Sequence, residues 1–99
     1  MKLNDYQIQA NETAIYPEGL NYPILGLAGE AGELCNKYKK IIRDKSGEAD
    51  LNDIDQLAKE LGDVLWYVAQ IATELGTDLE TVARVNIMKL GDRKERGVA

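Results

Sequence analysis

The chain has 99 residues and a formal net charge of −5, from 17 acidic and 12 basic residues, which predicts a single domain over residues 1–99 without the basic surface of a nucleic-acid-binding protein. Because it contains no histidine, His-ligated zinc sites, histidine general bases and Ser-His triads are excluded. The lone Cys35 rules out an intrachain disulfide, and neither a membrane span of about 20 apolar residues nor a signal-peptide pattern is present, so we expect a soluble cytoplasmic protein that binds no membrane.

Apolar residues at helical spacing predict four helices and no strand, and therefore an all-α fold. The first helix is predicted over residues 3–15, with Asn4 as its N-cap and a break at Pro17. The second is predicted over residues 24–43, after Pro23, because proline suits the first turn of a helix.

Three glycines lie in the first half of the second predicted helix, and each costs about 1 kcal/mol relative to alanine inside a helix. These are Gly26, Gly29 and Gly32. We therefore expect a backbone or a ligand to approach closely there, the alternative being that the first turns are irregular.

The third helix is predicted to begin after a cap at Asp50 or Asn52 and to end near Leu75. Trp66 projects away from the apolar stripe of this helix. We expect its indole to be exposed, or to be buried against a second subunit or a ligand.

Gly76 ends the third helix, and Thr77 and Glu80 have the spacing of a capping box. The fourth helix is predicted over residues 78–94. The tail at residues 95–99 is expected to fray.

Two pairs of carboxylates, each three residues apart, lie at the edges of apolar stripes. The second helix carries Glu30 and Glu33, and the third carries Glu60 and Asp63. One such pair is common on surface helices. Four carboxylates between packed helices, however, repel one another and need either Lys or Arg partners or a metal ion. Oxygen ligands alone favour Mg²⁺, with Mn²⁺ as a substitute.

Such an ion would screen a triphosphate and activate a water that attacks phosphorus, and a carboxylate could accept the proton of that water. On the fourth helix, Asn86, Lys89 and Arg93 share one side and could contact phosphates, although basic residues there also complement the helix dipole. Tyr67 and Trp66 could stack on a nucleobase, or could simply pack in the core or an interface.

The ordered motifs resemble the MazG-like family of all-α nucleoside triphosphate pyrophosphohydrolases. Glu30-x-x-Glu33 is followed, after 26 residues, by Glu60-Leu-Gly-Asp63, and later by Asn86-x-x-Lys89 and Arg93. The resemblance covers nearly the whole chain. In one departure, this chain has Gly29 where many members have a further glutamate.

This resemblance implies Mg²⁺-dependent cleavage of (deoxy)nucleoside triphosphates between the α and β phosphates, giving a monophosphate and pyrophosphate. It implies that Glu30, Glu33, Glu60 and Asp63 are metal ligands, and that Glu30 or Glu33 also orients or deprotonates the attacking water. It also implies a homodimer or homotetramer, in which helices of different subunits pair into a bundle.

Two other functions are compatible with the same residues. A non-catalytic helical module would use its acidic edges to bind a basic partner, and that binding would be sensitive to salt. A regulatory domain would bind nucleotide with a metal and leave it intact.

Overall fold

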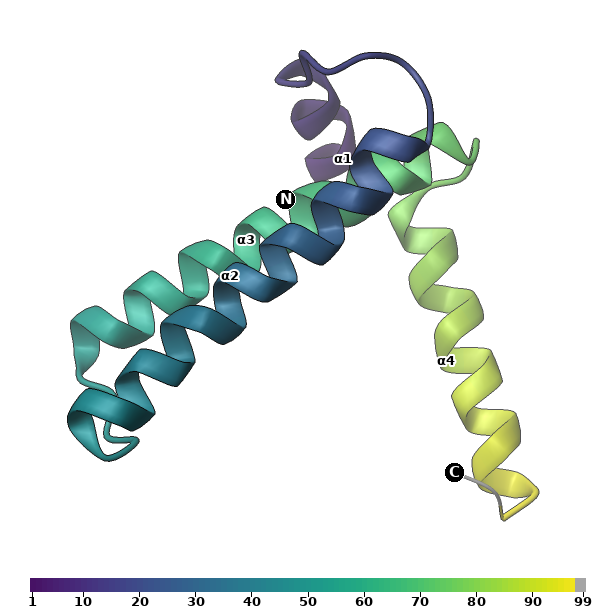
Figure 1. The fold of residues 1–99 in the computed structure, drawn as a ribbon. Helices are drawn as coiled ribbons and strands as arrows, with labels where there is room; N and C mark the ends of the chain where they lie inside the picture. The colour runs from purple at the N-terminus through teal and green to yellow at the C-terminus, as the bar shows by residue number, and fades with distance from the viewer. Residues whose placement is uncertain (98–99) are drawn as a thin grey trace.

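The computed structural model describes residues 1–97, so Val98 and Ala99, at the end of the tail expected to fray, lie outside it. The described residues form four helices and no strand, which confirms the all-α prediction. None of these helices is long and apolar enough to cross a membrane. In chain order, they are α1 (Leu3–Glu12), α2 (Asn21–Lys45), α3 (Leu51–Glu74) and α4 (Leu79–Glu95) (Figure 1).

The helix ends differ most from the predictions at the end of α1 and the start of α2. α1 ends at Glu12 instead of Ile15, because Thr13 closes the last turn with its hydroxyl donating to the Ala10 carbonyl at 2.7 Å. α2 begins at Asn21, so Pro23 lies inside its first turn, where a missing N–H leaves no hydrogen bond unmade.

α2 and α3 form a long antiparallel pair, seen as one arm of the molecule in Figure 1. Ser46 and Gly47 turn the chain at the end of α2 with φ of 55° and 81°, values that glycine adopts without strain. Of the two predicted caps, Asp50 is the one that caps α3, and its carboxylate accepts from the Asp53 N–H at 2.8 Å. This short connection brings α2 and α3, the two helices that carry the predicted carboxylates, side by side.

α1 packs across the other end of α3, where a small core includes Ala10, Ala69, Ala72 and Leu79. The buried Gln7 joins three elements there. Its Nε2 donates to the Thr73 hydroxyl at 3.0 Å and to the Thr77 carbonyl at 3.1 Å, and its Oε1 accepts from the Leu79 N–H at 2.8 Å.

The predicted caps of α1 and α4 are corrected by the structure. Asn4 lies inside α1, after Lys2 as the N-cap, and its side-chain oxygen accepts from the Glu80 N–H at 3.0 Å at the start of α4. Asp78 caps α4 in place of Thr77, by accepting from the Thr81 N–H at 2.8 Å. Both side chains therefore help to fix the start of α4.

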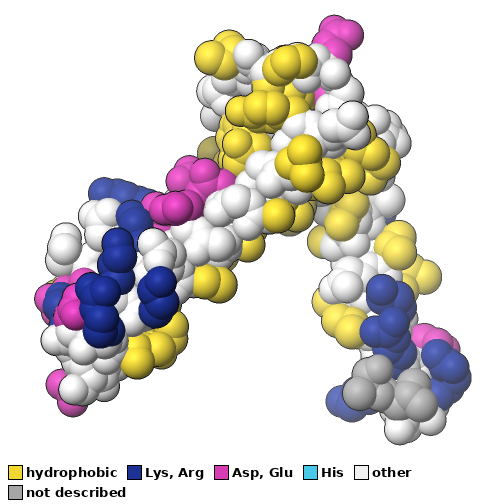
Figure 2. All heavy atoms as spheres, in the orientation of Figure 1, with side chains coloured by type: hydrophobic (Ala, Val, Ile, Leu, Met, Phe, Trp, Pro, Cys, Tyr) yellow, Lys and Arg dark blue, Asp and Glu magenta, His cyan; other side chains and the backbone are white. Residues whose placement is uncertain are grey.

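Beyond its first turn, α4 diverges from the α2–α3 arm (Figure 1). The radius of gyration is 16.3 Å, against about 13 Å for a compact domain of this length. Val85, Ile87 and Met88 are 58%, 68% and 67% exposed on α4, and Figure 2 shows apolar side chains along this arm. A helix that is apolar on several sides and has few contacts within its own chain presents a surface for another helix.

Among the three glycines of α2, close approach occurs at Gly26. A Cβ there would overlap the Tyr67 ring on α3, whereas a Cβ at Gly29 or Gly32 would meet nothing within 4 Å. The expectation of close approach is therefore confirmed at Gly26, and the structure shows none at the other two positions.

Gly26→Ala is expected to lower the thermal stability of the protein, because the methyl group would push the Tyr67 ring out of its place against α2. Gly32→Ala is the matched control. It adds a methyl group in open space within the same helix and should stabilise the protein by up to about 1 kcal/mol. Thermal unfolding followed by circular dichroism measures both, and equal melting temperatures for the two variants would contradict the Tyr67 contact.

Candidate metal centre

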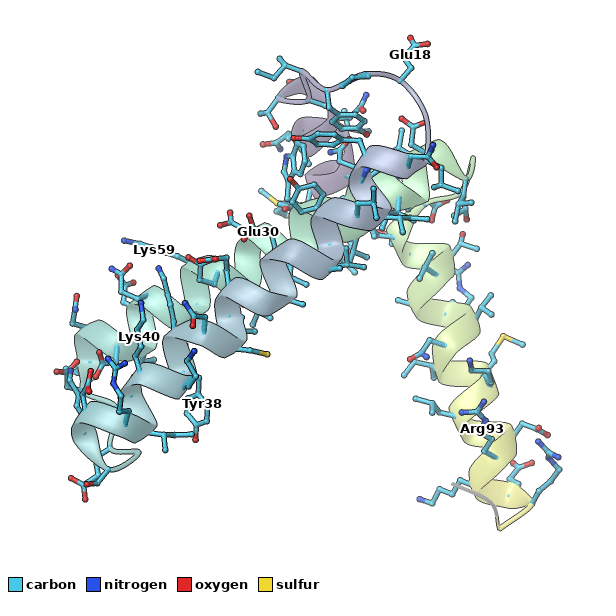
Figure 3. The ribbon with its side chains drawn as sticks, viewed as in Figure 1. Glu18, Glu30, Tyr38, Lys40, Lys59 and Arg93 are labelled. Carbon is cyan, nitrogen blue, oxygen red and sulfur yellow. The ribbon has the colours of Figure 1, made fainter. Side chains whose placement is uncertain are left out.

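Three of the four predicted carboxylates converge between α2 and α3. Glu30 of α2 and Glu60 and Asp63 of α3 each place one oxygen within 4.8 Å of the other two. The spacing of three residues puts Glu60 and Asp63 one turn apart on the edge of α3 that faces α2. Glu30 is labelled in Figure 3, and Figure 2 shows acidic side chains gathered part-way along this arm.

Glu33 is exposed and lies outside this group of three. Its charge nevertheless contributes to raising the pKa of Glu30. The structure thus brings Glu30, Glu60 and Asp63 together and leaves Glu33 as an exposed carboxylate one turn further along α2.

The Glu30 carboxyl shows the electrostatic cost of this arrangement. Burial raises its pKa above the usual value of 4.5, and the charges of Asp63 and Glu60 raise it further. Without metal, the fold favours the protonated form of Glu30, and at low pH this preference contributes to stability. The contribution is lost as pH rises through the raised pKa. A bound cation would remove the penalty by neutralising the charge.

Glu60 already has a cation beside it. The Lys37 ammonium lies 2.8 Å from Glu60 Oε1, and the Glu60 side chain is only 13% exposed. The hydrogen bond from Lys37 lowers the pKa of Glu60, and the same contact raises the pKa of Lys37. The cluster therefore combines one carboxylate that is paired with an internal cation and two that have no such partner among residues 1–97.

The donor set of the cluster fits a hard divalent cation. All three groups supply carboxylate oxygen, which Mg²⁺ and Mn²⁺ prefer over the nitrogen and sulfur ligands typical of zinc. The three carboxylates carry more negative charge than Lys37 alone can balance. Glu30, Glu60 and Asp63 are thus the residues that could hold a metal ion.

An aromatic pocket of about 280 Å³ lies where the α1–α2 connection meets α3. Tyr16 stacks on Tyr22 with ring centroids 5.0 Å apart, and Trp66 meets Tyr67 edge-to-face at 5.1 Å. The pocket is lined by Thr13, Ile15, Tyr16, Pro17, Tyr22, Trp66 and Tyr67.

Among the alternatives left open for Trp66, the structure shows packing within the chain. Its ring is partly buried within its own chain, where it contacts Tyr16, and its Nε1 donates to the Thr13 hydroxyl at 2.9 Å. Helical periodicity alone places this indole away from the core stripe of α3. The connection after α1, whose path the pattern does not predict, folds over it.

Tyr67 connects the aromatic pocket to the carboxylates. Burial raises the pKa of its hydroxyl, and Tyr22, Glu30 and Asp63 add to the rise. Burial also raises the pKa of Tyr6, with a further contribution from the Asp63 charge. Tyr67 follows Asp63 by one turn of α3, and its ring packs against Gly26, one turn before Glu30 on α2, so this ring lies beside the acidic cluster.

The sequence reasoning did not single out Tyr16 and Tyr22 as pocket residues. Each directly precedes a proline; Tyr16-Pro17 lies within the α1–α2 connection and Tyr22-Pro23 in the first turn of α2. That repeated pair is the signal that could have marked this connection as an aromatic wall.

The predicted phosphate-binding residues lie on the other arm. Asn86 and Lys89 line a groove along α4, and α4 does not pack against α2 in the described part of the chain. Figure 3 shows Arg93 far along α4, well separated from Glu30. Within one chain, these residues do not reach the carboxylate cluster.

Comparison with known proteins gives three further findings. The family described as MazG nucleotide pyrophosphohydrolase domain matches residues 21–98. The gene 37 protein of Mycobacterium phage L5 is 52% identical over 106 residues, covering 99% of this chain and 93% of that protein. The crystal structure of iMazG from Vibrio DAT 722 is similar with a TM-score of 0.66 and 30% identity, covering 96% of this chain and 97% of the other. The family match spans all three clustered carboxylates and the polar residues of α4.

Proposed function

The chain belongs to the MazG nucleotide pyrophosphohydrolase family, and we propose that it hydrolyses (deoxy)nucleoside triphosphates between the α and β phosphates, giving a nucleoside monophosphate and pyrophosphate. The observation that carries the proposal is the convergence of Glu30, Glu60 and Asp63 beside an aromatic pocket. A nucleotide requires a cation site for its phosphates and an aromatic surface on which its base can stack. The carboxylate cluster and the aromatic pocket would supply these two. A cytoplasmic location belongs to the same proposal.

Glu30, Glu60 and Asp63 would hold Mg²⁺, or Mn²⁺ in its place, with Glu33 one turn away. When bound, the ion supplies Lewis acidity toward the phosphate oxygens and lowers the pKa of water. Glu30 or Glu33 accepts the proton of the attacking water at a carboxylate oxygen. The position of Glu33 outside the three-oxygen group supports its assignment to this proton transfer, because its carboxylate is not engaged there.

The nucleobase would enter the aromatic pocket, where Tyr67 and Trp66 contact it. Base stacking on aromatic rings tolerates different bases, since every base has a π face. Tyr67 supports this orientation because it lines the pocket and lies one turn from Asp63, with its ring against Gly26 of α2. A nucleotide whose base is held there would have its phosphates directed toward Glu30 and Asp63.

The substrate phosphates would also be contacted by Asn86, Lys89 and Arg93 of a second copy, in a homodimer or homotetramer whose α2–α3 arms pair into a bundle. The divergent α4 supports this arrangement, because its apolar residues have few contacts within their own chain. The net charge of −5 offers no general attraction to nucleic acid, and we propose no such partner.

The direct test is a panel of nucleoside triphosphates incubated with Mg²⁺, with pyrophosphate and orthophosphate measured separately. We expect pyrophosphate and monophosphate in equal amounts from at least one nucleotide, and none when a chelator removes the metal. Orthophosphate as the sole product would overturn cleavage between the α and β phosphates. Tight binding of a nucleotide that stays intact would favour a regulatory domain, and no nucleotide-dependent heat in calorimetry would favour an interaction module.

A further inference from the structure

We infer that Lys37 is an exchangeable cation of this site, holding Glu60 when no metal is bound and moving to the β and γ phosphates of the substrate once the metal is in place. The inference rests on the proposed function. It assigns to Lys37 a positioning role that the carboxylates cannot supply.

Lys37 lies between the carboxylate cluster and a groove on the α2–α3 arm. It lies on α2, one turn beyond Glu33, and reaches across to Glu60 of α3 with an N–O distance of 2.8 Å. Among residues 1–97, it is the one Lys or Arg within 4.0 Å of a clustered carboxylate. Its side chain is 37% exposed, so the pair is open to solvent on one side.

On its other side, Lys37 lines a groove of about 340 Å³ between α2 and α3, toward the far end of the α2–α3 arm. Lys40, Lys45, Asp44 and Asp53 also line this groove, and Lys45 pairs there with Asp53 at 2.7 Å. The groove gives the flexible four-carbon side chain of Lys37 a place to move when it leaves Glu60.

Charge decides where the ammonium goes. Without metal, three carboxylates face one lysine, so Lys37 is attracted to the cluster. A divalent ion bound to the same carboxylates neutralises most of their charge and repels the ammonium. A triphosphate with several negative charges then becomes the stronger attraction, and lysine binds phosphate as a compact charge with three donors.

The position of Lys37 explains why it could bind Glu60 in the metal-free site and the substrate phosphates in the metal-bound site. The metal would bind the substrate near Glu30 and Asp63, and the phosphates beyond it would extend along α2 toward the groove. Lys37 would thus direct the leaving pyrophosphate away from the aromatic pocket and into the groove.

The test compares Lys37→Met with the wild-type protein by calorimetry, using two probes. Mn²⁺ alone reports on the carboxylates, and inorganic tripolyphosphate with saturating Mn²⁺ reports on the phosphate contact without a base. We expect Mn²⁺ to bind about three- to tenfold more tightly, because the competing cation is gone. We expect tripolyphosphate to bind at least about tenfold more weakly, because a charge-assisted hydrogen bond is lost.

Two further variants complete the experiment. Lys59→Met removes the same charge from α3, where Lys59 pairs with Asp55 at 3.2 Å and points to solvent (Figure 3), and both affinities should match the wild type. Lys37→Arg keeps the cation and should restore tripolyphosphate binding. If Lys37 had only a structural role, Lys37→Met would weaken the binding of both probes. Tighter Mn²⁺ binding together with weaker tripolyphosphate binding is therefore the signature of exchange.

The outcomes separate this inference from the function on which it rests. If the wild type binds Mn²⁺ and tripolyphosphate but Lys37→Met changes neither, or weakens both, the exchange role is overturned and the metal centre stands. If the wild type binds no Mn²⁺, or if Asp63→Asn leaves Mn²⁺ binding unchanged, the proposed metal centre is wrong and the inference falls with it.

Discussion

Asp63→Asn is expected to lower pyrophosphate release by about a thousandfold or more while leaving the helical fold intact. The substitution keeps the size of the side chain and removes the negative charge from one of three converging ligands. Losing several kcal/mol of the transition-state stabilisation that a bound cation supplies corresponds to a rate loss of this order. The Asp63 side chain is exposed, so the fold should tolerate the amide.

Asp55→Asn is the matched control on the same helix. Asp55 is exposed and pairs with Lys59, and surface pairs of this kind contribute little. Activity is measured as pyrophosphate release in Mg²⁺, and folding as helical circular dichroism. Undiminished activity in folded Asp63→Asn would remove the metal centre from the proposed function.

Ile87→Asp is expected to weaken assembly by about a hundredfold or more, and to abolish activity at concentrations where the wild type is assembled. Ile87 is 68% exposed on α4, and a charge buried in an interface costs several kcal/mol. Sedimentation or light scattering measures the change. Lys94→Asp places the same charge at a polar position of α4 and should remain assembled. A fully active wild-type monomer would contradict the proposed role of a second copy.

Mixing two inactive variants tests whether α4 acts on its partner. Asp63→Asn lacks a metal ligand, and Lys89→Met lacks a phosphate contact. If the site combines residues of two chains, mixed dimers contain one complete site out of two, and random mixing should restore about a quarter of the wild-type activity. No recovery in confirmed mixed dimers would place the complete site within one chain.

The placement of Glu60 and Asp63 together on one side of α3, next to α2, was predictable because it depends on local rules. Spacing of three residues at the edge of an apolar stripe places Glu60 and Asp63 on one side of α3, and the polar connection before Asp50 is short enough for α2 and α3 to pack as neighbours. The same local rules predicted four helices and, as one of two candidates, the cap at Asp50.

Other features depend on contacts between distant segments, which periodicity does not encode. The register between α2 and α3 decides that Lys37 meets Glu60 and that Glu33 stays outside the group. The path of the α1–α2 connection decides that Trp66 meets Tyr16. The direction of α4 likewise depends on hydrogen bonds from α1 and not on the pattern of α4 itself.

Those hydrogen bonds make α4 a lever with its pivot on α1. Gln7 and Asn4 hold the backbone N–H groups of Leu79 and Glu80 at the base of the helix. α4 has 17 residues, so it is about 25 Å long, and a tilt of about 10° at the base would move its far end by about 4 Å. The amide side chains of Asn4 and Gln7 therefore influence where Lys89 and Arg93 lie, and a small movement at the first turn of α4 would be magnified at its C-terminal end.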